Sequence, residues 1–342
     1  MFGLAIAAMV ASVAMIACSK DDAPAPQEEP EFYTVQLGWG GEIVDIAYEP
    51  LDTRAATDDL YGIQVYSTPD VELEEGEDVT WNRFAYGLFD DPNNITITLP
   101  KGYKYKFEAT MIVDGKNRIY KYEAGYGSPF ILTNGTNMGA SNTPITEKFD
   151  YQINLGFDNY YISYGETRLS NNWYGHRPNI ERFYGELENY SPKQSNNSIV
   201  IPMKRISFGA KFIATGTLAT SGTLEIELES APILELELTE GEDLISDIFT
   251  FGEVFGPWNY DDYTETIGVS FKWIREDGSI VPLGTHNVKF TRNMTTVVTV
   301  TINKDGETEG VGFEIDDSEK GPMPENEDNS VTIVDGEVET GE

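Results

Sequence analysis

The chain has 342 residues, of which 58 are acidic and 23 basic, so its formal net charge is −35 at pH 7. This charge repels the phosphates of nucleic acids and the headgroups of anionic membrane surfaces, so nucleic acid is excluded as an expected partner. The single cysteine allows no intramolecular disulfide, so core packing alone must hold the fold together. The length suits two domains, or one large domain, with sizeable cores.

The N-terminal residues are typical of an export signal. Residues 1–17 carry no charge and are almost wholly apolar or small, and the run ends at Cys18. The run is too short to span a bilayer, which favours a signal peptide that is removed. Residues 18–31 are rich in Pro and Glu and are expected to form an extended tether. The alternative is a spare buried cysteine in a cytosolic protein.

The segment Met15-Ile16-Ala17-Cys18 resembles the lipobox of bacterial lipoproteins. The resemblance implies that Cys18 becomes the first residue and carries acyl chains such as palmitate, which anchor the protein without a transmembrane helix. Met15 stands where Leu is usual, and the first two residues include no Lys or Arg, so we expect the true start to lie upstream. The acidic residues that follow resemble those of cell-surface lipoproteins of Bacteroidetes.

Residues 32–190 are expected to form a first β-sandwich domain. Alternation of apolar and polar residues over Phe32–Tyr48 predicts two strands, separated by glycines. Residues 51–59 are a polar linker that contains Arg54. Asp114-Gly115 predicts a hairpin, since both central positions of a type I′ turn need positive φ. A short helix over Asn179–Leu187 is also considered. Further strands are expected over residues 60–67, 81–89, 95–99, 103–113, 117–122, 149–155 and 160–164.

A second β-sandwich domain is expected over residues 199–315, after the polar stretch Ser191–Ser198. Asp277-Gly278 predicts a second hairpin, and one helical turn is considered within Glu242–Phe251. Strands are expected over residues 206–213, 224–228, 234–238, 266–275, 280–283, 286–290 and 295–302. The predicted class is therefore all-β, with two sandwiches of transthyretin-like or immunoglobulin-like Greek-key type.

Residues 316–342 form an acidic tail whose composition is typical of disorder. Val331, Ile333 and Val334 nevertheless make a strand-like segment that has no obvious partner within its own domain. The segment is either a strand that pairs elsewhere or a disordered end with incidental valines.

Catalytic signatures are missing from the sequence. The two histidines, His176 and His286, stand alone, and no Cys/His cluster has metal-ligand spacing. Neither a nucleophile elbow nor a phosphate-binding loop appears in context. We therefore expect no enzyme, no cofactor and no metal site. Two alternatives stay open: a hydrolase with two carboxylates among the many, and weak Ca²⁺ binding at the acidic turns 90–94 and 260–263, which are more often ordinary turns.

Four aromatic residues in loops are candidates for stacking against sugar rings, namely Trp173, Tyr174, Trp258 and Tyr260. Rings of this kind are more often half-buried in a sheet, so the two interpretations stand side by side. A glycan-binding surface lipoprotein is accordingly the second functional hypothesis.

The lipobox, the acidic all-β composition and Thr53-Arg54-Ala55 after the first strands together resemble the fimbrillin-like surface proteins of Bacteroidetes, of major or minor fimbrial subunit type. In that family a protease cuts after an arginine, an N-terminal strand is lost, and a strand of the next subunit fills the groove. The resemblance implies a cut between Arg54 and Ala55, loss of Phe32–Tyr48, and Val331, Ile333 and Val334 as donor strand.

We therefore expect a non-enzymatic fimbrial or adhesion subunit at the cell surface, lipid-anchored in the outer membrane or built into a fimbria after processing. The expected partners are other fimbrial subunits or a second copy of the chain, together with a host or glycan ligand. An edge left open by a removed strand offers unpaired backbone groups that another chain can satisfy. A head-to-tail contact of this kind grows into a fibre.

Overall fold

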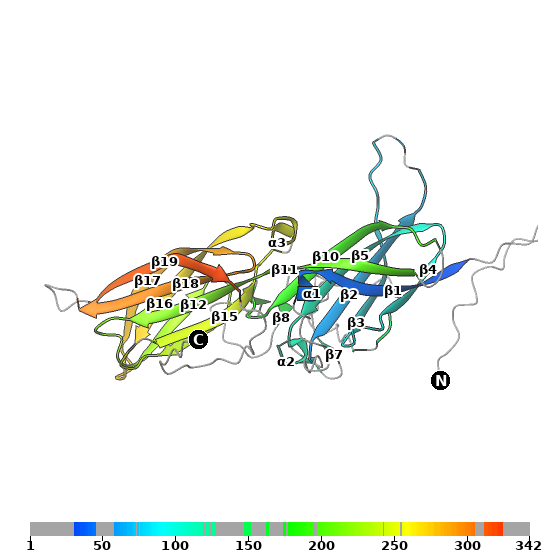
Figure 1. The fold of residues 1–342 in the computed structure, drawn as a ribbon. Helices are drawn as coiled ribbons and strands as arrows, with labels where there is room; N and C mark the ends of the chain where they lie inside the picture. The colour runs from blue at the N-terminus through cyan, green and yellow to red at the C-terminus, as the bar shows by residue number, and fades with distance from the viewer. Residues whose placement is uncertain are drawn as a thin grey trace, which may run out of the picture. The chain divides into compact units, whose positions relative to one another are not determined.

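The structure is a computed structural model. It describes residues 31–45, 58–72, 74, 76–118, 121–122, 125–126, 145, 147–151, 162–163, 174–175, 177–193, 197–241, 243–253, 255–304 and 311–323. Over these ranges the protein is all-β, as the alternating sequence predicts, and its few helices are single turns (Figure 1).

Seven strands form the first sheet. Their order across it is β3 (Asn82–Phe89), β2 (Leu60–Pro69), β5 (Tyr103–Ile112), β10 (Arg182–Tyr190), β11 (Asn197–Arg205), β1 (Phe32–Gly41) and β4 (Thr96–Pro100). All neighbours are antiparallel except β1 and β11, which run parallel. A parallel pair needs a long connection between its strands, and the first sheet supplies it because five other strands of the sheet lie between β1 and β11 in the chain.

One hydrophobic cluster receives buried side chains from all seven strands. The two end strands both contribute, β3 through Phe89 and β4 through Ile97. The sheet therefore curves around its own core, and alternate residues face inward as a period of two requires. In β1 the inward residues are Tyr33, Val35 and Leu37, which are 6%, 0% and 1% exposed.

Two four-stranded sheets share the second core. One has the order β15 (Asp243–Thr250), β12 (Ser207–Thr215), β18 (Met294–Lys304) and β19 (Val311–Pro322). The other has the order β14 (Ile233–Glu237), β13 (Thr223–Leu228), β16 (Thr264–Ile274) and β17 (Ile280–Thr291). The rings of Phe212 and Phe271 meet edge to face across this core, with centroids 6.1 Å apart. Burial of such side chains contributes about 1.5–3 kcal/mol each.

The residues that were expected to open the second domain belong to the first sheet. Residues Ile199–Pro202 lie in β11, which pairs with β10 on one side and β1 on the other. The chain passes from the first sheet to the second core at Ile206, between β11 and β12. The polar stretch before β11 is thus a hairpin connection within one sheet, because β10 and β11 are antiparallel neighbours.

Of the two predicted hairpins, the one at Asp277-Gly278 is confirmed. It joins β16 to β17, and Gly278 has a φ of 80°. The one at Asp114-Gly115 is wrong, although Asp114 does have a positive φ of 54°. The carbonyl of Asp114 accepts hydrogen bonds from Asn117 N and Arg118 N, which turns the chain into α2 (Gly115–Arg118).

Three further local predictions are wrong: one expected strand begins as a helical turn, and two segments considered as helices are strands. The second strand expected before Tyr48 is replaced at its start by a helical turn, α1 (Glu42–Asp45). The helices considered over Asn179–Leu187 and within Glu242–Phe251 are instead the strands β10 and β15. Partners in the sheet, β5 and β12, override the weak local helix signal in these segments.

The remaining elements are short. They are α3 (Phe255–Asn259), the pair β6 (Lys121–Tyr122) with β7 (Gly125–Tyr126), and the pair β8 (Ile162–Ser163) with β9 (Tyr174–Gly175). None of the helices in the described ranges has the length and apolar character needed to cross a bilayer.

Candidate functional site

Most residues singled out from the sequence lie outside the described residues: Cys18, Arg54, Ala55, Trp173, His176, Val331, Ile333 and Val334. Tyr174 is described only as part of the backbone of β9. The structure therefore neither brings these residues together nor separates them. The described candidates are Trp258, Tyr260, the acidic turns and the expected N-terminal strand, β1.

Trp258 and Tyr260 differ in exposure although they are two residues apart. The Trp258 ring meets Tyr184 of β10 edge-on, with centroids 5.8 Å apart, in a small cluster that also includes Ile206. Tyr260 is 63% exposed. Tyr260 is thus the more accessible of the two rings for an external ligand, while Trp258 packs one side against the first sheet.

The acidic turns use their carboxylates in internal contacts. Asp90 forms an ion pair with Lys116 at 2.5 Å, and Asp91 accepts hydrogen bonds from Asn93 N and Asn94 Nδ2, both at 2.9 Å. At the other turn Asp261 accepts a hydrogen bond from Lys204 Nζ at 2.7 Å, which holds the pKa of that carboxyl below its usual range. In the described part of the chain, no group of three acidic, His or Cys side chains could hold a metal ion.

β1 lies inside the first sheet, between two partners. Residues Val35–Gly41 pair with Asn197–Met203 of β11, and residues Phe32–Gln36 pair with Thr96–Pro100 of β4. The sequence could suggest that this segment is a strand, but not that it has a neighbour on each side. Removing β1 would therefore uncover two rows of backbone donors and acceptors and the core beneath Val35 and Leu37.

Among the described strands, β4 reaches the sheet only through β1. Further contacts continue past the paired residues: Leu37 N donates to Ile95 O at 2.8 Å, and Trp39 Nε1 donates to Pro92 O at 3.1 Å. Gln36 Nε2 donates to Asn93 O at 3.1 Å. β1 thus fixes both β4 and the turn that leads into it.

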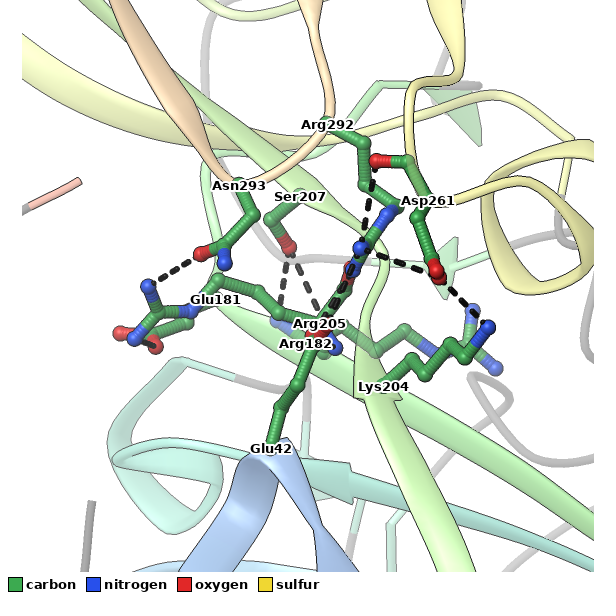
Figure 2. A network of polar contacts seen from close by, with 9 residues as sticks. All are labelled: Glu42, Glu181, Arg182, Lys204, Arg205, Ser207, Asp261, Arg292 and Asn293. Carbon is green, nitrogen blue, oxygen red and sulfur yellow. Dashed lines mark hydrogen bonds and ion pairs between the residues drawn. The ribbon is translucent and has the colours of Figure 1, made fainter. Parts of the chain in front are cut away.

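A buried arginine holds the residue that follows β1. Arg292, in the turn between β17 and β18, is 4% exposed. It donates from Nη1 to Glu42 Oε2 at 2.7 Å and from Nη2 to Glu42 Oε1 at 3.0 Å (Figure 2). Such a two-pronged arginine–carboxylate pair is among the stronger hydrogen-bonded contacts in proteins.

The same carboxylate also caps the end of β11. Glu42 Oε2 accepts a hydrogen bond from Arg205 N at 2.8 Å, and Arg292 Nη1 donates to Arg205 O at 2.9 Å. The Arg205 guanidinium turns away toward Glu181 Oε1 and Asn293 Oδ1, both at 2.8 Å (Figure 2). Figure 2 shows Glu42 on the segment that follows β1, and Arg292, Asn293 and Asp261 on segments that belong to the second core.

A second connection between the first sheet and the second core is the segment Arg177–Glu181, which leads into β10. Arg177 N donates to Ser230 O at 2.9 Å, and its side chain forms an ion pair with Glu265. Thr250 N donates to Pro178 O at 3.0 Å and Thr250 Oγ1 to Ile180 O at 3.0 Å. Tyr263 lies nearby, and burial, with Glu265 and Glu253, raises its pKa to about 12.

A charged cluster covers the other face of β5 and β10. Lys106 Nζ lies 3.1 Å from carboxylate oxygens of Glu108 and Glu186 and 3.0 Å from Glu188. Glu108 and Glu186 stand directly opposite each other in the pairing of β5 with β10. Burial raises the pKa of the Glu108 carboxyl, and Lys106 works against this rise. One lysine therefore neutralises carboxylates that would otherwise repel across the strand pair.

The charged side chains of the described residues form ionic contacts around Glu42 and around Lys106. His286 Nε2 lies 3.8 Å from Asp317, and both side chains are about a third exposed or more, at 40% and 33%. The network at Glu42 cannot be predicted from the sequence because Arg205 and Arg292 lie 163 and 250 residues from Glu42 in the chain. The available signal was weak: the chain has 23 basic residues among 58 acidic ones, so each basic residue is a candidate for an ion pair, but the sequence does not indicate its partner.

The chain matches no protein-family model and no curated protein sequence. Similar solved structures do exist. The fimbrial anchor protein Mfa2 from Porphyromonas gingivalis is 8% identical, with 84% of this chain and 98% of that chain covered and a TM-score of 0.34. A "putative cell adhesion protein" from Bacteroides eggerthii is 12% identical, with 84% and 95% covered and a TM-score of 0.37.

A structure from Bacteroides thetaiotaomicron described as "putative polysaccharide binding proteins" is 10% identical, with 86% of this chain and 98% of that chain covered and a TM-score of 0.35. These three solved structures are thus described as a fimbrial anchor protein, a "putative cell adhesion protein" and "putative polysaccharide binding proteins". With identities of 8–12% and TM-scores below 0.5, these likenesses are too distant to assign a role to any residue here.

Proposed function

We propose that the protein is a non-enzymatic surface lipoprotein that serves as a structural or adhesion subunit of a fimbria-like assembly. The observation that carries this proposal is the place of β1, an N-terminal strand with a partner on each side and a buried inner face. Arg54 follows it in the polar linker before β2. Cys18 supplies the lipid anchor that holds the unprocessed chain to the outer membrane.

Two β-sandwich domains of transthyretin-like or immunoglobulin-like Greek-key type, followed by an acidic tail that begins after β19, are part of this proposal. The tail was expected over residues 316–342, but residues 316–322 belong to β19, which pairs with β18. The curved seven-stranded sheet would be the first domain and the paired four-stranded sheets the second. We put the division at Ile206, where the chain leaves β11, rather than at Ser191–Ser198.

Strand exchange is the proposed mode of assembly. A cut between Arg54 and Ala55 would break the covalent connection between β1 and the rest of the chain. β1 would then stay in place only through strand pairing, core packing and ion pairs. Once β1 leaves, β11 and β4 have unpaired edges, and a strand from another molecule can satisfy both. Val331, Ile333 and Val334 of a second copy are the proposed donor, since apolar side chains must fill the places of Val35 and Leu37.

Digestion with an arginine-specific protease tests the proposal. Three of the described arginines, Arg182, Arg205 and Arg292, are 1%, 7% and 4% exposed, so they should resist cleavage. Arg275 is exposed in the turn between β16 and β17, so N-terminal sequencing of the fragments distinguishes a cut there from one at Arg54. We expect a first cut at Arg54, followed by an SDS-resistant ladder and filaments in electron micrographs. The matched control is Arg54→Lys, which keeps the charge and removes the cleavage site. A ladder in the control, or a cut wild-type protein that stays monomeric, would contradict strand exchange.

Glycan binding is the second candidate function, because Tyr260 is 63% exposed. Exposed tyrosines can stack against sugar rings while the hydroxyl donates a hydrogen bond. A glycan array probed with the unprocessed protein should then give a signal that Tyr260→Ala abolishes. Trp173→Ala, Tyr174→Ala and Trp258→Ala test the other three candidate rings. Tyr103→Ala is the matched control, since Tyr103 is 41% exposed in β5.

A further inference from the structure

The contact between Glu42 and Arg292 bears on what can replace β1. The inference drawn from this contact rests on the proposed strand exchange and adds a requirement for the donor strand. Glu42 lies five residues after Leu37, the last fully buried residue of β1, so the apolar strand and the carboxylate belong to one short segment. A protease that cuts at Arg54 would release both together. The site they leave is therefore apolar along its length and cationic at one end.

That cationic end cannot easily become neutral by itself. Arg292 is 4% exposed and keeps its charge at any relevant pH. Without Glu42, it would retain the carbonyls of Arg205 at 2.9 Å and Asp261 at 3.3 Å, and the Asp261 carboxylate at 3.7 Å. That carboxylate is already hydrogen-bonded to Lys204 at 2.7 Å. The backbone N–H of Arg205 would lose its acceptor as well.

A buried arginine without a carboxylate is costly, and so is a buried N–H without an acceptor. We infer that the vacated site selects a donor strand that brings its own carboxylate to Arg292 and Arg205 N, and that the donor is the acidic tail of a second copy. Apolar side chains alone would fill the groove and leave its charged end unsatisfied. The carboxylate would thereby set the register of the incoming strand.

The tail has the composition that this site requires. Residues 324–342 include seven acidic residues and no Lys or Arg. If Val331 and Ile333 take the places of Val35 and Leu37, then Glu337 and Glu339 follow Ile333 by four and six residues. These two spacings bracket the five-residue interval between Leu37 and Glu42. Glu337 and Glu339 are thus the carboxylates assigned to Arg292.

The test uses the full chain after cleavage with the arginine-specific protease. Fluorescent peptides of residues 32–45 and 324–342 are exchanged into the processed protein, and their dissociation rates are followed by anisotropy. Glu42→Gln in the first peptide, and Glu337→Gln with Glu339→Gln in the second, should speed dissociation about tenfold. In processed Arg292→Gln protein, checked for folding by circular dichroism, the same changes should have little effect.

Matched controls remove equal charge elsewhere in each peptide: Asp45→Asn in the first, and Glu325→Gln with Glu327→Gln in the second. Control effects equal to those of the test substitutions would overturn the inference, because they would indicate general charge attraction. Tight binding that Glu42→Gln or the Glu337 and Glu339 changes leave unaltered would also overturn it, while strand exchange would stand. Failure of both peptides to bind would contradict strand exchange itself, and this inference with it.

Discussion

Glu42 and Arg292 are 250 residues apart in the chain, yet both carboxylate oxygens of Glu42 accept hydrogen bonds from the guanidinium of Arg292. This pair ties the segment after β1 to the turn between β17 and β18. It thus connects the first sheet, whose core lies beneath β1, to the second core, which lies beneath β17 and β18.

We expect Glu42→Gln to lower the free energy of unfolding by about 1–3 kcal/mol, because the buried guanidinium of Arg292 loses its counter-charge. The loss is smaller than for a fully buried ion pair, since the Glu42 side chain is 30% exposed. Urea unfolding measures the effect. Lys204→Met is the control. It breaks the ion pair between Lys204 and Asp261, whose side chains are 34% and 80% exposed, and should lower the free energy of unfolding less than Glu42→Gln does. Equal losses in the two variants would contradict the role assigned to Arg292.

The Lys106 cluster predicts a loss of stability that depends on pH. Burial by itself would lower the pKa of the Lys106 ammonium, but Glu188, Glu108 and Glu186 outweigh it and raise this pKa. The stabilisation by Lys106 is therefore fully present below the ordinary lysine pKa and is lost only as the pH rises through the folded value. Lys106→Met should cost about 2–4 kcal/mol at pH 8, where Glu108 and Glu186 are left opposed.

At pH 5 the same variant should lose less. The pKa of Glu108 is raised, so this carboxyl binds its proton more tightly in the folded state, which favours folding at low pH and is lost as the pH rises through the folded pKa. Lys104→Met is the matched control, since its bridge to Asp70 is 37% exposed on both sides. A Lys106→Met loss that is as large at pH 5 as at pH 8 would argue against the cluster.

Gly185 should tolerate no side chain. It lies in β10 opposite Met203 of β11, and an added Cβ would overlap the carbonyl oxygen of Pro202 and lie 2.7 Å from Met203 Sδ. Gly185→Ala is expected to destabilise by about 2–3 kcal/mol. At Gly268 in β16 the nearest atom to an added Cβ is 3.7 Å away, so Gly268→Ala should stay within about 0.5 kcal/mol. Thermal unfolding of both variants decides between these expectations.

The dependence of β4 on β1 predicts a local effect in hydrogen exchange. Leu37→Ala removes a side chain that is 1% exposed and should cost about 2–4 kcal/mol. Amides of Thr96–Leu99 in β4 should then exchange faster than those of β3, because β4 is paired with the sheet through β1. Thr34→Ala, at an exposed position of β1, is the control. Equal acceleration in β3 and β4 would mean global unfolding instead.

The all-β class and most strand positions could be predicted from alternation alone. Residues such as Leu224, Ile226 and Leu228 face one core because side chains on a strand alternate with a period of two. The hairpin at Asp277-Gly278 could be predicted as well, because the turn depends only on a residue that adopts positive φ, and Gly278 does so. The same local signal misled at Asp114, where the next residues form a helical turn and β5 finds its partners in β2 and β10.

Pairing across long distances in the chain was decided by the tertiary structure. Nothing in the sequence of β1 indicates a parallel partner at residues 197–203 or a second partner at residues 96–100. Likewise, no sequence pattern connects Arg292, in the turn between β17 and β18, with Glu42, which lies 250 residues earlier in the chain. Alternation depends on one strand's own backbone geometry, whereas the order of strands and the meeting of Glu42 with Arg292 depend on which surfaces bury most apolar area together.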